Sequence, residues 1–262
     1  MKLVANKIRM KISLIQTSLA WEDAAANRAN FTQLINGIAE TDLIVLPEMF
    51  VTGFSMNPKA VAETMQGATV TWMVEAAKAK NAAITGSLVI EEDGKYYNRL
   101  FFVYPDGEIK TYNKRHLFTY ADEDKFYTPG TEKLIVEYKG FKICPLVCYD
   151  LRFPVFSRNA EGYDVLLYVA NWPQVRTLAW DTLLRARAIE NQAYVVGVNR
   201  VGMDEVHQHY VGDSAIYGPA GEVIVHSQEP GSFYAELYGD KLLEYRQKFP
   251  AHMDADDFEL RF

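Results

Sequence analysis

Short runs of aliphatic, β-branched and aromatic residues recur along the chain, and two of them are almost continuously apolar. These two are LIVLP (43–47) and VLLYVA (165–170). Continuous apolar runs are typical of strands that are covered on both faces, as in α/β proteins. Further strand-like runs span residues 11–16, 83–90, 99–104, 134–138, 141–148, 193–199, 214–217 and 222–227. The chain is therefore predicted to form sheets enclosed by other layers.

Helical patterns alternate with these runs, at residues 24–39, 69–80 and 176–192. The first two place apolar residues at helical spacing, and the third contains no Gly or Pro. Turn signals of the kind that close hairpins lie between several of the strand-like runs. This mixture favours α/β layers with mixed sheets over a purely doubly wound fold.

No linker, low-complexity run or internal repeat divides the chain. We therefore expect one domain over residues 1–262, with its core at about residues 10–250, a loose tail over residues 1–9 and an acidic C-terminal tail. The chain carries 27 basic and 34 acidic residues, a net charge of −7. Because nucleic-acid binding needs a basic surface, this balance argues against a nucleic-acid partner.

The start of the chain lacks an apolar run long enough for a signal peptide. No stretch approaches the roughly 18 apolar residues of a membrane helix, so we expect no membrane partner. The only two cysteines, Cys144 and Cys148, lie four residues apart on a predicted strand. That spacing separates them by about 13 Å, which is beyond disulfide reach. We expect both to be free thiols in a reducing cytoplasm.

Two polar side chains are placed where α/β proteins carry chemistry. Glu48 directly follows LIVLP, at the C-terminal edge of a buried strand. Lys114 lies in TYNKRHLF, just after another predicted strand. A surface or helix-capping glutamate and a solvated lysine are the alternatives for these two positions. His116, between two apolar residues, is interpreted as a hydrogen-bonded core histidine rather than a ligand.

Cys148 ends an apolar run and precedes a turn in which Pro154 is suited to the first position of a helix. A strand, a small nucleophile and a turn are the ingredients of a nucleophile elbow, which exposes the side chain and directs backbone N–H groups toward it. A helix N-terminus there also favours a thiolate. The alternative is a buried and inert strand cysteine.

No metal or cofactor site is expected from the sequence. Cys144 and Cys148 have no second cysteine pair, and the pair His207 and His209 has no partner cluster. The glycine-rich loops that bind nucleotide phosphates are also absent from the sequence.

Three segments carry a resemblance to a known family. LPEMFVTGF, YNKRHLF and PLVCYDLRFP resemble, in this order, the glutamate, lysine and cysteine motifs of the nitrilase superfamily. ANWP (170–173), the segment 185–202 and the segment 212–224 resemble its later motifs, so the resemblance spans about residues 10–250. CYDLRFP is similar to the amidase side of the superfamily, and the segments together look most like bacterial omega-amidases. Val155 departs from many relatives, which carry Glu after the proline.

The resemblance implies a four-layer α-β-β-α sandwich with two mixed sheets, assembled as a homodimer or larger homo-oligomer. It implies a thiol-dependent amidohydrolase that cleaves the terminal amide of small 2-oxo acid monoamides, such as 2-oxoglutaramate and 2-oxosuccinamate, through a cysteine thioester. One alternative is another hydrolase of the superfamily, acting as a nitrilase or on N-carbamoyl amines or deaminated glutathione. An alternative of another class is a non-catalytic scaffold that retains the fold.

The resemblance also implies roles for particular residues. Cys148 would be the nucleophile and Glu48 the general base, while Lys114 and the backbone N–H of Tyr149 would hold the oxyanion. Glu123 lies six residues before the proline of a Pro-Gly pair, where many family members place a second glutamate. It would orient the lysine or the substrate amide, although two neighbouring aspartates compete for this assignment.

The substrate carboxylate would need a cationic partner. Arg152, Arg176 and Arg200 are candidates because they lie in or near the matched segments, and structural or surface roles stay open for each. Three aromatic residues are candidates for the wall of a small pocket, with an ordinary core role as the alternative: Phe54, Tyr120 and Trp172.

Overall fold

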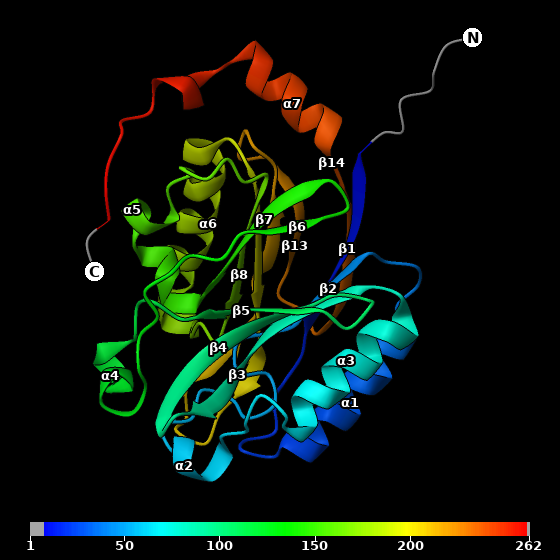
Figure 1. Cartoon of the computed structure of the whole chain (residues 1–262), viewed down its shortest axis with the longest axis vertical. Helices are drawn as coiled ribbons and strands as arrows, with labels where there is room; N and C mark the ends of the chain where they lie inside the picture. Colours follow the sequence, from blue (N-terminus) through cyan, green and yellow to red (C-terminus); the bar gives the residue numbers. More distant parts are fainter. Residues whose placement is uncertain (1–7, 261–262) are drawn as a thin grey trace.

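The computed structural model describes residues 8–260. Two six-stranded sheets face each other and helices cover their outer faces (Figure 1), which confirms the predicted four-layer α-β-β-α sandwich. The first sheet has the order β14-β1-β2-β3-β4-β5 and the second has the order β13-β12-β9-β8-β7-β6. In each sheet a parallel core of three strands is flanked by antiparallel strands, so both sheets are mixed, as predicted.

The strands of the first sheet are β1 (Arg9–Gln16), β2 (Leu43–Val45), β3 (Ala83–Glu92), β4 (Lys95–Val103), β5 (Ile109–Asn113) and β14 (Gly231–Tyr238). Those of the second sheet are β6 (Val136–Tyr138), β7 (Phe141–Val147), β8 (Val165–Ala170), β9 (Tyr194–Asn199), β12 (Ser214–Tyr217) and β13 (Val223–Ser227). A separate hairpin consists of β10 (Val201–Met203) and β11 (His209–Val211).

The helices are α1 (Ala24–Gly37), α2 (Pro58–Val61), α3 (Ala68–Lys80), α4 (Glu123–Phe126), α5 (Pro154–Ser157), α6 (Thr177–Asn191) and α7 (Gly239–Lys248). Short 3₁₀ turns occupy η1 (Thr119–Ala121), η2 (Cys148–Arg152), η3 (Gln174–Arg176) and η4 (Ala251–Asp254). The three predicted helices correspond to α1, α3 and α6, with ends that differ by at most two residues. Within residues 8–260, no helix has the length and apolarity that crossing a membrane requires.

The alternation of side chains in the first sheet explains why the layers stack. Ile12 and Leu14 of β1 belong to the core between the two sheets, whereas Ile15 belongs to the core beneath α1 and α3. Successive residues of a strand point to opposite faces, so one strand supplies both cores. Figure 1 shows α1 and α3 side by side along the first sheet and α6 on the side of the second sheet.

The second sheet is covered closely by α6. Gly197 of β9 allows this approach, because a Cβ atom there would lie 2.5 Å from a Leu184 methyl and 2.8 Å from the Trp180 ring. Both of these α6 side chains are fully buried. Hydrophobic burial therefore fixes the helix against β9.

Three parallel strands end next to polar residues at one edge of the sandwich. Glu48 follows β2, Cys148 follows β7 and Asn171 follows β8. This edge is where open α/β sheets place ligand chemistry. The placement of the glutamate and the cysteine agrees with the sequence-based expectation.

The chain termini differ in part from expectation. Residues 1–7 of the predicted loose tail lie outside the described residues, but Arg9, also assigned to that tail, is the first residue of β1. The acidic C-terminal segment begins with η4 and continues without regular structure to residue 260.

Candidate active site

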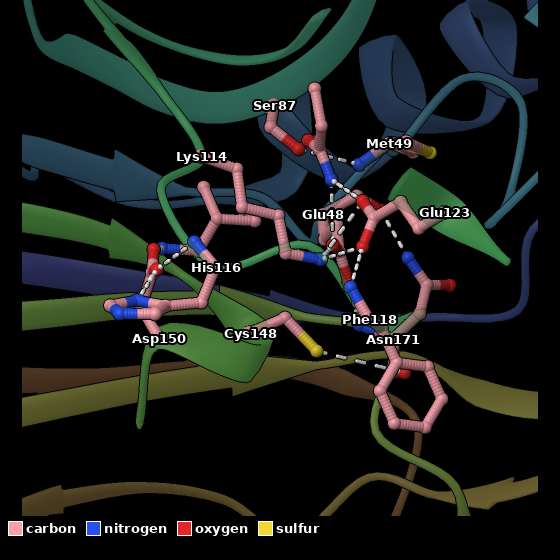
Figure 2. Close-up of polar contacts among 12 residues, drawn as sticks. Glu48, Met49, Ser87, Lys114, His116, Phe118, Glu123, Cys148, Asp150 and Asn171 are labelled. Atoms are coloured by element: carbon pink, nitrogen blue, oxygen red, sulfur yellow. Dashed lines mark hydrogen bonds and ion pairs between the residues drawn. The ribbon is translucent and has the colours of Figure 1, made fainter. Parts of the chain in front are cut away.

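A buried lysine joins two buried carboxylates at the strand edge (Figure 2). The Nζ atom of Lys114 lies 2.9 Å from Glu48 Oε1, and 3.1 Å and 2.9 Å from the two carboxylate oxygens of Glu123. All three side chains are fully buried. The exposed Asp122 and Asp124, which competed with Glu123 in the sequence, lie outside this cluster, and Asp122 pairs with Lys125 instead.

The carboxylate of Glu48 is held by two further donors. The side-chain amide of Asn98 donates to Oε1 at 2.8 Å, and the backbone N–H of Asn171 donates to Oε2 at 2.8 Å. The side-chain amide of Asn171 also donates to the backbone oxygen of Glu48 at 2.5 Å. The next residue, Met49, has a positive φ of 42°, and its N–H donates to Ser87 Oγ at 2.9 Å. The glutamate is therefore fixed in orientation by its neighbours on both sides.

Cys148 adopts the geometry of a nucleophile elbow. It is the first residue of η2 and has a φ of +45°, a left-handed conformation that is strained for a residue with a side chain. Its sulfur lies 3.9 Å from the carbonyl oxygen of Asn171, and Figure 2 shows it beside Lys114 and Glu48. Pro154 begins α5, as predicted.

The electrostatics of the cluster favour a protonated thiol at rest. Burial raises the pKa of Cys148 well above its ordinary value, and the Glu48 carboxylate raises it further, against the opposing effect of Lys114. The expectation that the helix N-terminus favours a thiolate is therefore wrong for the resting site, because desolvation and a neighbouring anion outweigh it. The sulfur needs a base to remove its proton.

The charges around Lys114 also shift the pKa values of their partners. Burial alone would lower the pKa of Lys114, but Glu123 and Glu48 outweigh burial and raise it. Burial raises the pKa of Glu123, and the Glu48 carboxylate adds to this effect while Lys114 opposes it. Lys114 therefore stays protonated, and the carboxylates of Glu48 and Glu123 both pair with its ammonium group.

A cavity of about 680 Å³ opens onto this cluster, and Cys148, Lys114 and Asn171 form part of its lining. Five of the six side chains named as candidates for substrate contact also line it: Phe54, Tyr120, Arg152, Trp172 and Arg176. Tyr149, whose backbone N–H was predicted to bind the oxyanion, lines the same cavity.

Arg200 does not line the cavity, and its candidacy for substrate binding is not supported. The residue is fully buried, and its guanidinium donates to the backbone oxygens of Leu19, Val201 and Met203. It also lies over the ring of Tyr210, with its central carbon 4.6 Å from the ring centre. These contacts give it a structural role in the β10–β11 hairpin region.

The other two arginines present their guanidinium groups to the cavity. Arg152 lies 5.1 Å from the centre of the Trp172 ring, and Arg176 lies over the rings of Phe118 and Tyr120 at 5.4 Å and 5.1 Å. Across residues 8–260, neither guanidinium has a carboxylate within ion-pair distance. Stacking on aromatic faces leaves the N–H edges of an arginine available for an anion.

In the described part of the chain, no group of three or more His, Cys, Asp or Glu side chains is arranged to hold a metal ion. His116 is hydrogen-bonded, as predicted, but it is partly exposed rather than in the core: its Nδ1 lies 2.8 Å from Asp150 Oδ1, and its ring centre lies 3.7 Å from that of Phe153.

Sequence reasoning missed three residues of this site: Asn98, Asn171 and Asp150. Asn171 ends the run VLLYVAN, so the strand-edge argument that selected Glu48 applies to it equally. Asp150 lies within the cysteine motif, but its contacts depend on residues from another strand. Asn98 lies inside β4 with no local signal, and only the fold shows its contact with the carboxylates.

Comparison with known proteins agrees with this geometry. A family described as carbon-nitrogen hydrolase matches residues 11–242, which is most of the chain. The chain belongs to this family and is an amide-hydrolysing enzyme, and the resemblance to the nitrilase superfamily is confirmed.

The individual relatives are similar over nearly the whole chain. The chain is 49% identical over 253 residues to Omega-amidase YafV of Escherichia coli strain K12, which covers 96% of this chain and 98% of that protein. It is 34% identical over 219 residues to the 2-oxoglutaramate amidase of Bacillus subtilis strain 168, with 81% of this chain and 84% of that protein covered. The crystal structure of XC1258 from Xanthomonas campestris, a CN-hydrolase superfamily protein with an arsenic adduct in its active site, matches with a TM-score of 0.95 and 44% identity. That match covers 97% of this chain and 99% of the other.

Proposed function

We propose that the enzyme is an omega-amidase that hydrolyses the terminal amide of short 2-oxo acid monoamides, such as 2-oxoglutaramate and 2-oxosuccinamate. The products are the 2-oxo dicarboxylate and ammonia. The observation that carries the proposal is one cavity lined both by a thiol beside the Glu48–Lys114–Glu123 cluster and by two arginines that have no carboxylate partner within residues 8–260. The names of the relatives, omega-amidase and 2-oxoglutaramate amidase, support this substrate class.

In the first half of the proposed reaction, Glu48 accepts the thiol proton of Cys148, and the sulfur attacks the amide carbon. The carbonyl oxygen becomes an oxyanion, the C–N bond then breaks, and Glu48 returns the proton to the departing nitrogen so that ammonia leaves. A thioester on Cys148 remains. A base is needed because burial keeps the resting sulfur protonated by raising its pKa.

In the second half, Glu48 takes a proton from a water molecule as that water attacks the thioester carbon. The C–S bond breaks, the carboxylic acid product leaves, and the sulfur regains a proton from Glu48. The fixed orientation of the glutamate suits both halves, because three donors hold its carboxylate while the cysteine lies beside it.

Two donors would stabilise the oxyanion in both halves. Lys114 lines the cavity and keeps its charge, since its two carboxylate partners raise its pKa despite burial. Tyr149 is the second residue of η2, and N–H groups in the first turn of a helix have no partner within that helix. Loss of one such donor typically lowers the rate by about 10²–10³-fold. Glu123 would hold Lys114 in place through its two bonds to Nζ.

Arg152 and Arg176 would bind the carboxylate next to the 2-oxo group. A planar guanidinium matches a carboxylate with two parallel hydrogen bonds, which also sets the distance to the reacting amide. Aromatic rings hold both groups: Trp172 lies beneath the first, and Phe118 and Tyr120 lie beneath the second. This arrangement favours a short, anionic amide over a neutral N-carbamoyl amine.

Compartment and assembly are also part of this proposal. We propose a cytoplasmic enzyme, supported by two buried, unpaired thiols. A homodimer or larger homo-oligomer is supported by exposed apolar side chains on α5 and α6, namely Val155, Leu178 and Ile189.

The proposal is tested by measuring ammonia release from a panel of small amides. We expect 2-oxoglutaramate to be the best substrate, ahead of N-carbamoyl amines, deaminated glutathione and simple nitriles. Preference for one of these other substrates would replace the proposed specificity with another of the superfamily. Absence of ammonia release from every compound would favour the scaffold alternative.

A further inference from the structure

Asp150 accepts four hydrogen bonds although it does not line the cavity. The side chain is fully buried, two residues after the nucleophile. Its Oδ1 receives the backbone N–H of His116 at 2.9 Å and the Nδ1 of the same residue at 2.8 Å. Its Oδ2 receives the Tyr112 hydroxyl at 2.8 Å and the backbone N–H of Val147 at 3.0 Å. Figure 2 shows the bonds between Asp150 and His116 to the left of the catalytic cluster.

The four donors come from two segments that belong to different sheets. Tyr112 lies on β5 of the first sheet, and His116 follows in the loop that carries Lys114. Val147 ends β7 of the second sheet, immediately before Cys148. A single carboxylate therefore connects the segment bearing the ammonium to the segment bearing the thiol.

Each of these bonds requires an acceptor at Asp150. Two donors face each carboxylate oxygen, so a neutral amide in its place would set an N–H₂ group against two other donors. Burial raises the pKa of Tyr112 well above its ordinary value, and Asp150 adds to this effect, so the phenol keeps its proton and donates. The Tyr112 oxygen in turn accepts the backbone N–H of Arg115 at 3.0 Å, which extends the connection along the lysine loop.

The elbow has a particular need for such a connection. Cys148 holds a strained, left-handed backbone conformation that persists only where its surroundings fix it. We propose that Asp150 is a positioning residue, which fixes the distance and angle between the Cys148 thiol and the Lys114 ammonium by fastening their two loops together. This inference rests on the proposed function, in which those two groups act on one carbonyl.

The first test is Asp150→Asn. This variant keeps the shape of the side chain but replaces one carboxylate oxygen, which accepts two hydrogen bonds, by an NH₂ group that accepts none. We expect kcat for 2-oxoglutaramate to fall by about 10²-fold with KM little changed, since misplacement of a reacting group by about 1 Å costs this much. The alkylation of Cys148 by iodoacetamide, located by mass spectrometry, should slow by about tenfold or more because it depends on proton transfer to a correctly placed base.

Asp164→Asn is the matched control. This aspartate also connects separate segments, accepting the Lys142 N–H at 3.0 Å and pairing with Arg246 at 2.9 Å, but it lies just before β8, at the opposite end of that strand from the site. Its variant should lower the unfolding temperature and leave kcat and alkylation at their wild-type values.

A pair of His116 variants tests the same connection without changing Asp150. His116→Asn retains an N–H donor near the position of Nδ1 and should keep most of the wild-type kcat. His116→Leu removes the donor and should lose about tenfold, as expected for a hydrogen bond to a charged group. Both variants lose the stacking on Phe153, so the difference between them isolates the hydrogen bond.

The inference is overturned if Asp150→Asn lowers only the unfolding temperature, with kcat and the alkylation rate unchanged. It is also overturned if the two His116 variants have equal kcat, a comparison that remains available should Asp150→Asn not fold. If the wild-type enzyme hydrolyses no amide, the proposed function fails by itself, whereas the alkylation rates still report whether Asp150 positions the thiol.

Discussion

Replacement of Lys114 by methionine removes the one cation that two buried carboxylates share. Methionine has a similar length and no charge. The change deletes three bonds from Nζ, of 2.9 Å to Glu48 and of 3.1 Å and 2.9 Å to Glu123. All three side chains are fully buried, so the two remaining carboxylates have little contact with bulk water.

The expected magnitude follows from this burial. Removing one partner of a buried ion pair costs about 3–5 kcal/mol of folding free energy, because the remaining charge stays desolvated and unpaired. For a chain of this size, that loss corresponds to a fall of about 6–20 °C in the unfolding temperature. Lys125→Met is the matched control, because Lys125 makes its 2.8 Å pair with Asp122 at the exposed surface, where such pairs contribute about 0–1 kcal/mol.

The loss should depend on pH in a definite direction. Burial already raises the pKa of Glu123 and the Glu48 carboxylate raises it further, whereas Lys114 and the backbone N–H of Phe118 lower it. Without the ammonium, a carboxyl of this pair has a folded pKa further above its unfolded value of about 4.3, so the folded state binds more protons. Stability therefore rises as pH falls through that window. Lys114 itself contributes fully below its unfolded pKa of about 10.4, so its own titration does not interfere.

Urea unfolding followed by tryptophan fluorescence measures this effect, comparing variant with wild type at about pH 8 and about pH 5.5. We expect the deficit of Lys114→Met to shrink at the lower pH, and Glu123→Gln added to it to recover part of the stability at the higher pH. A deficit below about 1 kcal/mol at the higher pH, or one that is equal at both pH values, would refute the electrostatic account of this cluster.

Two further predictions concern single positions. Cys148→Ala should abolish ammonia release while the circular dichroism spectrum stays native. Cys144→Ala, which changes a fully buried strand residue, should keep most of the activity. The opposite result would overturn the assignment of the nucleophile. Gly130→Ala should lower the free energy of unfolding by about 1–3 kcal/mol and also lower kcat, because its Cβ would lie 2.2 Å from the backbone oxygen of Asn113, next to Lys114. Thermal unfolding and ammonia assays of this variant check both effects, and an unchanged melting temperature would contradict the steric argument.

The sequence predicted those elements whose local pattern agrees with their tertiary role. β2 and β8 are almost fully apolar because layers cover both faces, and the turns at residues 105–107, 139–140 and 219–221 each close an antiparallel pair. The α1 and α6 helices were found from their spacing and composition. In each case, burial and propensity favour the same structure.

The missed elements have weak local patterns. α7 buries only Leu242 among its ten residues, so its sequence gives little sign of a buried face. β14 pairs along β1 at the edge of its sheet, a contact between chain ends that no local pattern reveals. The hairpin of β10 and β11 was missed because its strands are only three residues long.

The same distinction applies to the site. Glu48, Lys114 and Cys148 were found because charged or reactive side chains stood in motif positions after strands, and Glu123 was found from its spacing before a Pro-Gly pair. Asn98 was not found, because a neutral amide inside a strand is indistinguishable from many others until the fold brings it within 2.8 Å of a carboxylate. Arg200 was wrongly included, because nearness to a matched motif does not reveal that a side chain turns inward toward backbone oxygens.

The pairing of β1 with β14 affects the order in which the strands of the first sheet can pair during synthesis. The strand β1 is made early, yet its antiparallel neighbour consists of residues 231–238, so one side of β1 stays unpaired until that late segment has left the ribosome. An uncovered strand edge is a site for wrong pairing with other chains. A nascent chain that stalls before this last strand would therefore contain every reactive group of the catalytic centre. It would still expose an unpaired strand edge to other chains.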